Sequence, residues 1–192
     1  MIGLLTPIAA MAGIFAGGWM MGATIYLALG IYPFLDLIAG KSSKTDPLEE
    51  GKAFNYIVHI HAILVPTVVI VLLYAAYQEY SSFIWLAAIS VGLSSGASGI
   101  VTAHELGHRR PRSVSWWLSR LDLMCVLYLH FTVEHNHTHH KHWARPRDPT
   151  SSPWGRNVYF HFLRTIPLQL RGAYRARPRD FRYSMLVQAC LL

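Results

Sequence analysis

The chain has 192 residues, of which 53% are hydrophobic and only 14% are charged. Soluble domains carry roughly 25% charged residues, so the composition excludes an ordinary soluble domain and predicts a membrane protein. The formal net charge is +7, and most of the basic residues lie between Arg109 and Arg182.

The first 35 residues contain no charged side chain. At ~1.5 Å per residue this run is far longer than a ~30 Å hydrocarbon core. It therefore predicts two membrane spans, residues 2–16 and 19–38, with a break near Gly17 and Gly18. A polar loop over residues 40–53 follows, and two more spans are predicted over residues 54–77 and 83–103.

Two features of the third and fourth spans concern packing. His59 and His61 are spaced i, i+2 and therefore lie on divergent helix faces, so we expect them to line a polar cavity or face a neighbouring helix. The small residues around Gly92, Gly96 and Gly99 predict close helix approach. Room for a tunnel that ends at His104 is the alternative.

Histidines are concentrated in two boxes, HELGH at residues 104–108 and EHNHTHH at residues 134–140. On a helix, His104 and His108 are spaced i, i+4, so both rings face one ion. His135 and His139 repeat that spacing, and His140 adds a donor. Imidazole nitrogens suit iron, zinc and copper. Five of them exceed what one four-coordinate zinc needs, so the boxes predict two metals or one metal-rich cluster.

Other residues near the boxes are candidates for supporting roles: Glu105, Glu134, His130 and His137. The two carboxylates adjoin ligand histidines and would orient imidazoles as hydrogen-bond acceptors. A solvated carboxylate, or one at a helix N-terminus, is an equally good explanation for Glu134.

The segment over residues 114–133 is long enough to cross the membrane, but a single crossing would separate the two boxes. Arg120 and Asp122 also argue against deep burial. We therefore predict an interfacial or re-entrant helix, with Trp116 and Trp117 at the level of the lipid headgroups.

The rest of the chain, from Pro146 to Arg182, is polar and basic. The run NVYFHFLRTIPLQL within it predicts a surface-lying amphipathic segment. Residues 183–192 predict the start of a fifth transmembrane helix that is too short to span a bilayer, so we expect a truncated chain.

Together these elements predict an all-α, polytopic membrane helical bundle of about four complete transmembrane helices plus the start of a fifth. We expect three regions: a transmembrane bundle over 1–103, a histidine-box metal site with interfacial helices over 104–182, and the new helix over 183–192. Basic residues accompany both boxes, so the positive-inside rule predicts that this region faces the cytoplasm.

The strings HELGHRR and LHFTVEHNHTHH, the dipeptide Asp148-Pro149 and the apolar hairpin ending PFLDL resemble the integral-membrane alkane 1-monooxygenases over nearly the whole chain. The resemblance implies a non-haem di-iron (Fe) site that uses O2 to hydroxylate the terminal carbon of medium-chain n-alkanes, with electrons from rubredoxin. Residues matching the family's ligands are His104 and His108 in the first box and His135, His139 and His140 in the second.

The same resemblance implies a multi-pass protein of the bacterial inner membrane. Its expected partners are the lipid bilayer, a medium-chain alkane or other long apolar substrate, and an acidic rubredoxin on the basic cytoplasmic face; no nucleic acid is expected.

The chain departs from the family pattern at three places. Thr138 replaces a glycine of the second box, and residues 145–149 read RPRDP where the family has TPEDP. The family's third histidine box lies further along and is absent from this sequence, so the remaining ligands are expected beyond residue 192. One expectation is therefore that the chain alone is inactive.

Three alternatives stay open. A membrane fatty acid desaturase or hydroxylase shares the logic of the boxes. A membrane-embedded HExxH zinc metalloprotease would use Glu105 as its general base but leaves the second box unexplained. A non-catalytic truncated homologue would bind metal or assemble with a partner subunit.

Overall fold

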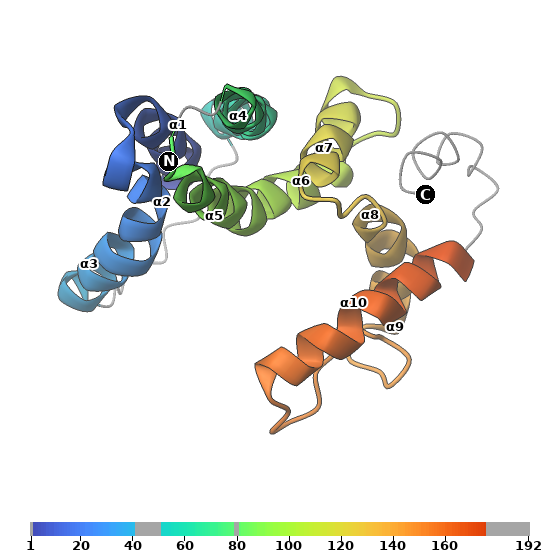
Figure 1. Cartoon of the computed structure of the whole chain (residues 1–192). Coiled ribbons are helices and arrows are strands. Elements are labelled where there is room, and N and C mark those ends of the chain that lie inside the picture. The colour runs from blue at the N-terminus through green and yellow to red at the C-terminus, as the bar shows by residue number, and fades with distance from the viewer. Residues whose placement is uncertain (1, 41–50, 79–80, 176–192) are drawn as a thin grey trace. The chain divides into compact units, whose positions relative to one another are not determined.

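A computed structural model describes residues 2–40, 51–78 and 81–175 of the chain. The predicted fifth helix, residues 183–192, lies outside this range. The chain divides into two compact units, Met1–Leu127 and Tyr128–Leu192, and each is treated separately below. Every regular element that the structure describes is helical, as predicted (Figure 1).

The first unit contains a series of helices and shorter helical turns. In chain order these are η1 (Ile2–Leu4), α1 (Leu5–Ala16), η2 (Gly18–Gly22), α2 (Ala23–Ile25), η3 (Tyr26–Ile31), α3 (Tyr32–Ala39), α4 (Lys52–Tyr77), α5 (Ile84–Ser94), η4 (Ser95–Gly99), α6 (Ile100–Gly107) and α7 (Val114–Cys125). Several of them run on without a break, so η2 to α3 and α5 to α6 each form one long helix.

Three helices among the described residues are long and apolar enough to cross a membrane: Gly18–Ala39, Ala53–Tyr77 and Ile84–Gly107. The shortest has 22 residues, which corresponds to about 33 Å and therefore matches a hydrocarbon core. The predicted spans over 19–38, 54–77 and 83–103 are confirmed as helices. The last continues past residue 103 and carries His104 on its final turns.

The predicted first span differs. Helix α1 has 12 residues, which reach only about 18 Å, so three of the four complete spans expected from the sequence have the necessary length. The break at Gly17 and Gly18 is confirmed, because both residues have positive φ, 75° and 55°. The turn is tight: a Cβ at Gly13 would lie 2.2 Å from the Met20 carbonyl oxygen. Glycine therefore ends α1 early and folds the chain back.

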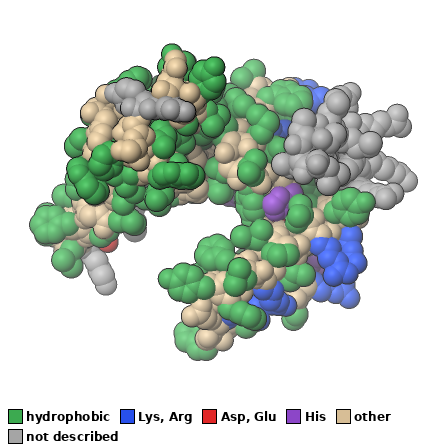
Figure 2. Space-filling view, in the orientation of Figure 1, with side chains coloured by type: hydrophobic (Ala, Val, Ile, Leu, Met, Phe, Trp, Pro, Cys, Tyr) green, Lys and Arg blue, Asp and Glu red, His purple; other side chains and the backbone are tan. Residues whose placement is uncertain are grey.

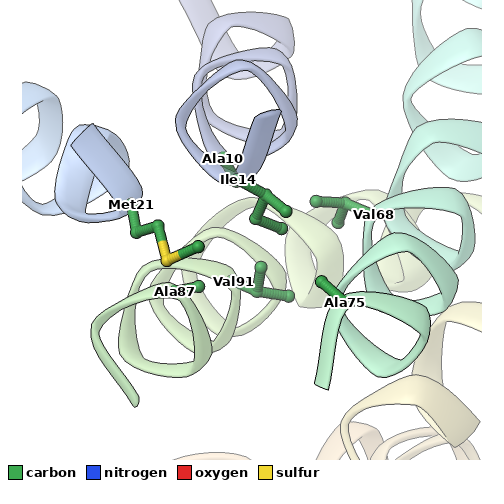
Figure 3. Packing of buried hydrophobic residues seen from close by; sticks show 7 residues of the cluster. All are labelled: Ala10, Ile14, Met21, Val68, Ala75, Ala87 and Val91. Carbon is green, nitrogen blue, oxygen red and sulfur yellow. The ribbon is translucent and has the colours of Figure 1, made fainter. Parts of the chain in front are cut away.

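The core of the first unit lies between α1, η2, α4 and α5 (Figure 3). Its buried side chains are small or flexible: Ala10, Ile14, Met21, Val68, Ala75, Ala87 and Val91. Small side chains let helices approach closely, which is how helices associate in lipid. Buried hydrogen bonds also join α2 to α5 and α1, since Ser90 Oγ accepts from Thr24 N at 3.0 Å and Thr24 Oγ1 donates to the Thr6 carbonyl at 2.9 Å.

Of the three glycines that predict close helix approach, only one makes such a contact. A Cβ at Gly99 would lie 3.3 Å from both methyl groups of Val65 on α4. Gly92 and Gly96 have no described atom within 4 Å of the equivalent position. The packing expectation is therefore confirmed at Gly99 alone.

Helix α7 is not one of the candidate spans, in agreement with the prediction of a non-crossing helix. It begins after Ser113, whose hydroxyl accepts from Trp116 N, and packs on α6 and α4. Ser119 Oγ donates to the Ala103 carbonyl of α6 at 2.6 Å. The Asp122 side chain is buried within the protein, where it is only 1% exposed. Burial raises its pKa to about 8, so the carboxyl group is kept neutral near pH 7.

The second unit contains α8 (Phe131–Glu134), η5 (His135–His139), α9 (His140–His142) and α10 (Val158–Arg175). The predicted amphipathic segment is confirmed as α10, which packs on α8. Thr165 Oγ1 donates to the Pro149 carbonyl at 2.9 Å, and the Tyr128 hydroxyl donates to Gln169 Oε1. Gly172 of α10 lies near Glu134, since a Cβ there would be 3.7 Å from Glu134 Cγ, an ordinary van der Waals distance.

Candidate metal centre

The first histidine box lies on the last turns of α6. His104 Nε2 and His108 Nε2 are 3.1 Å apart, and the two rings meet edge to face with centroids 4.7 Å apart. The i, i+4 spacing therefore brings both nitrogens to one point, as predicted.

Glu105, between these two histidines, lies in an exposed ion pair. Its Oε1 accepts from Arg109 Nη2 at 2.9 Å, and the same guanidinium nitrogen donates to Asn55 Oδ1 on α4 at 3.1 Å. The Glu105 carboxylate is thus engaged by a cation, which fixes the end of α6 against α4.

The second box forms a π-helical turn, η5, over His135–His139. Because residues five apart meet in a π-helix, the pair that converges is His135 with His140, whose Nε2 atoms are 3.1 Å apart. The sequence had suggested the i, i+4 pair, His135 with His139. Those two rings instead stack, with centroids 5.3 Å apart. Single π turns occur often at functional sites.

His139 is oriented by a buried carboxylate. Its Nδ1 lies 2.9 Å from Asp148 Oδ2, and the Asp148 side chain is fully buried. A hydrogen bond from Nδ1–H to a carboxylate leaves Nε2 with the lone pair that a metal needs. In the sequence, Asp148 stands out only as part of the dipeptide Asp148-Pro149, and this role could not be predicted from it.

A small network holds Asp148 itself. Ser151 Oγ donates to Oδ2 at 2.6 Å, and Thr150 donates to Oδ1 from both its backbone nitrogen (3.0 Å) and its hydroxyl (2.6 Å). Burial by itself raises the pKa of Asp148, but the hydrogen bonds from Ser151, Thr150 and His139 outweigh it and hold the pKa below its usual value. The carboxylate is therefore ionised beside the imidazole.

Two other predicted residues lie next to the second box, Glu134 buried and His130 half-buried. Glu134 is 1% exposed, and its pKa is raised to about 7, first by burial and then by the charge of Asp148, with His139 opposing. His130 caps α8 and contacts the Tyr128 ring edge to face, and burial lowers its pKa. The side chain of His137 is outside the described part of the chain.

His59 and His61 do not converge, as predicted. His59 Nε2 lies 2.9 Å from Ser115 Oγ of α7, whereas His61 Nδ1 lies 2.9 Å from Thr102 Oγ1 of α6. Each therefore faces a different neighbouring helix.

The two nitrogen pairs suit metal binding. Ligands of one ion lie about 3.0–3.4 Å apart when each metal–nitrogen bond is about 2.1 Å, and both pairs, each within its own unit, have a separation of 3.1 Å. All four donors are imidazoles, which bind iron well. The residues therefore fit an iron site.

Three long apolar helices and two such histidine pairs indicate a multi-pass membrane protein of the histidine-box class. No family model matches the chain. It is similar to alkane 1-monooxygenase 1 of Alcanivorax borkumensis, with 30% identity over 88% of this chain and 44% of that protein. It is 36% identical to the alkane 1-monooxygenase of Acinetobacter baylyi over 80% of this chain, and 31% identical to that of Pseudomonas putida over 82%.

The chain is therefore homologous to the alkane 1-monooxygenases, as the resemblance of its two boxes implied. It spans about two fifths of the length of these relatives, namely 44%, 41% and 39%.

Proposed function

We propose that the chain belongs to a membrane-bound alkane 1-monooxygenase that hydroxylates the terminal carbon of medium-chain n-alkanes. The observation that carries the proposal is the pair of imidazole nitrogens 3.1 Å apart in each box, in a chain homologous to proteins of that name.

Five histidines would hold the iron: His104 and His108 from the first box, and His135, His139 and His140 from the second. A non-haem di-iron group, when bound, supplies the O2-dependent oxidation of an unactivated C–H bond. The chain's own contribution is to set the imidazole tautomers and directions. Asp148 does this for His139, and the π turn does it for His135 and His140.

Glu134 lies buried beside the second box, and its pKa is raised to about 7. When this carboxyl group is protonated, it adds no negative charge beside the imidazoles.

The proposed partner is an acidic rubredoxin that delivers electrons at the basic surface near the boxes. Exposed cations flank the first box at Arg109, Arg110 and Arg112, and the second at Lys141, Arg145 and Arg147. Charge complementarity of this kind raises association rates. On the positive-inside rule, we propose that these cations face the cytoplasm of a bacterial cell, with the spans in the inner membrane.

The zinc metalloprotease alternative receives no support from the first box. A general base must reach the water beside the metal, whereas the Glu105 carboxylate is paired with Arg109 at 2.9 Å. The protease alternative also leaves the second box, with its oriented His139, without a role.

The experiment is to fuse the chain to the C-terminal part of the Acinetobacter baylyi alkane 1-monooxygenase, to express it in a bacterial host with rubredoxin and its reductase, and to supply n-octane under ¹⁸O2. We expect 1-octanol that carries the label, and its loss in His135→Ala. An alkene product would favour the desaturase alternative, and no NADH-dependent product at all would contradict the proposal.

A further inference from the structure

Helix α10 is built with its polar side inward. The residues it buries are Thr165, Gln169 and Ala173, spaced i, i+4, i+8 along one stripe. Thr165 and Gln169 each hydrogen-bond within the second unit, to the Pro149 carbonyl and the Tyr128 hydroxyl. A helix on a protein surrounded by water would bury its apolar side instead.

The apolar side of α10 is exposed. Leu163 and Tyr159 are each 76% exposed, and Ile166, Leu170 and Tyr174 are between 46% and 67% exposed. At about 100° per residue, these five side chains fall within an arc of about 80°. Figure 2 shows hydrophobic side chains along the visible face of this helix.

The arginines of α10 lie on a third side of the helix, apart from the polar stripe and the apolar arc. Arg164, Arg171 and Arg175 are exposed, and at about 100° per residue they fall within about 40° of one another, roughly 120° from the middle of the apolar arc. The helix contains no aspartate or glutamate. Arginines in this position reach the headgroup region while the apolar arc is immersed, because their long side chains extend along the surface.

We propose that α10 lies in the plane of the membrane–water interface, with its apolar arc among the lipid acyl chains and its arginines on anionic headgroups. Its polar stripe then fastens the unit that carries the second histidine box to the bilayer surface, through the hydrogen bonds of Thr165 to the Pro149 carbonyl and of Gln169 to the Tyr128 hydroxyl. Helices of this kind bind membranes through buried apolar area together with attraction to anionic lipids.

Charge and composition favour a bilayer over a second copy of the chain. The three arginines and the absence of a carboxylate on α10 suit anionic headgroups, whereas a second copy of α10 offers no charge that complements them. Tyr159 and Tyr174 lie near the two ends of α10, and tyrosine is enriched at membrane–water interfaces.

The test uses a fluorophore, NBD, on single cysteines of the reconstituted chain in which Cys125 and Cys190 are replaced by serine. Labels are placed at Leu163→Cys or Leu170→Cys, with Ser152→Cys in a loop of the same unit as the matched control. The vesicles contain phosphatidylglycerol and phosphatidylcholine with shallow spin-labelled lipid. We expect blue-shifted emission and strong lipid quenching at 163 and 170, and neither at 152.

Two results would overturn the proposal. Labels at 163 and 170 that are protected from aqueous iodide but not quenched by the lipid would mean that protein covers this face. Labels quenched by iodide alone would mean that the face is in water.

The charge component is tested by a second pair of variants. Arg164→Gln with Arg171→Gln should reduce lipid quenching in anionic vesicles and leave it unchanged in purely zwitterionic ones. Arg145→Gln with Arg147→Gln removes the same charge from exposed loop positions and should have no effect. Equal effects of the two pairs would contradict specific headgroup contacts of α10. Because neither readout uses metal or turnover, this proposal can fail or succeed independently of the proposed function.

Discussion

Replacing Asp148 with asparagine tests how the second box is oriented. The two oxygens of Asp148 accept four hydrogen bonds: two from Thr150 on Oδ1, and one each from Ser151 and His139 on Oδ2. Asparagine offers one oxygen and one NH2 group. Whichever way the amide turns, one pair of donors faces another donor.

The magnitude follows from these contacts. A buried donor left without an acceptor costs about 1–3 kcal/mol, so we expect a lower melting temperature. Loss of a carboxylate that orients a ligand imidazole weakens metal binding by about 10- to 100-fold. The variant should therefore lose iron affinity beyond what its lower stability explains.

Ser151→Ala supplies the matched control. It removes one hydrogen bond to Asp148 and one to the Ala144 nitrogen, but leaves the carboxylate on His139. We expect it to lower the melting temperature and to keep iron affinity, measured by chelator competition, close to that of the unmodified chain. If both variants lose iron affinity equally, or if neither does, Asp148 has only a structural role.

Three further expectations concern other parts of the chain, each read from thermal unfolding in detergent. Gly13→Ala should destabilise the chain, because its Cβ would lie 2.2 Å from the Met20 carbonyl oxygen. Gly92→Ala has open space around it, so it should leave stability unchanged or raise it by up to about 1 kcal/mol through helix propensity. Equal changes in melting temperature for the two variants would contradict the tight turn. Asp122 has its pKa raised to about 8 in the folded chain, so its contribution is full below about pH 4 and falls as pH rises towards 8. The advantage of Asp122→Asn should therefore grow from pH 5 to pH 8, and a pH-independent difference would refute the burial effect. Gly172→Ala should be tolerated, since its Cβ would lie 3.7 Å from Glu134 Cγ. Gly172→Leu should lower stability, because its larger side chain would push α10 away from Glu134. If the leucine variant is as stable as the alanine variant, α10 does not pack against Glu134 at this position.

Much of the fold could be predicted from hydropathy. The three long spans and the break at Gly17 and Gly18 follow from the length of the apolar runs and the conformational freedom of glycine. The shortness of α1 could not be predicted, because an apolar segment has the same hydropathy whether it crosses the membrane completely or extends only part of the way. The burial of Asp122 depends on the contact of α7 with α6, which no local pattern reveals.

The candidate site shows where local spacing stops being informative. The i, i+4 rule gave the pair His104 and His108 correctly, since α6 is a regular α-helix. It selected His139 as the partner of His135, whereas the π turn brings His140 to that position. Asp148 lies nine positions after His139, beyond α9, and its only local signal was the pair of hydroxyl neighbours, Thr150 and Ser151, which is typical of a carboxylate held in a turn.

The most direct test of the central claim is the metal content of the detergent-purified chain, measured by mass spectrometry together with Mössbauer spectroscopy after growth on ⁵⁷Fe. We expect bound iron, and its loss both in His104→Ala with His108→Ala and in His135→Ala with His140→Ala. Iron retained by both double variants, or zinc near one per chain in place of iron, would contradict the assignment of the two boxes as an iron site.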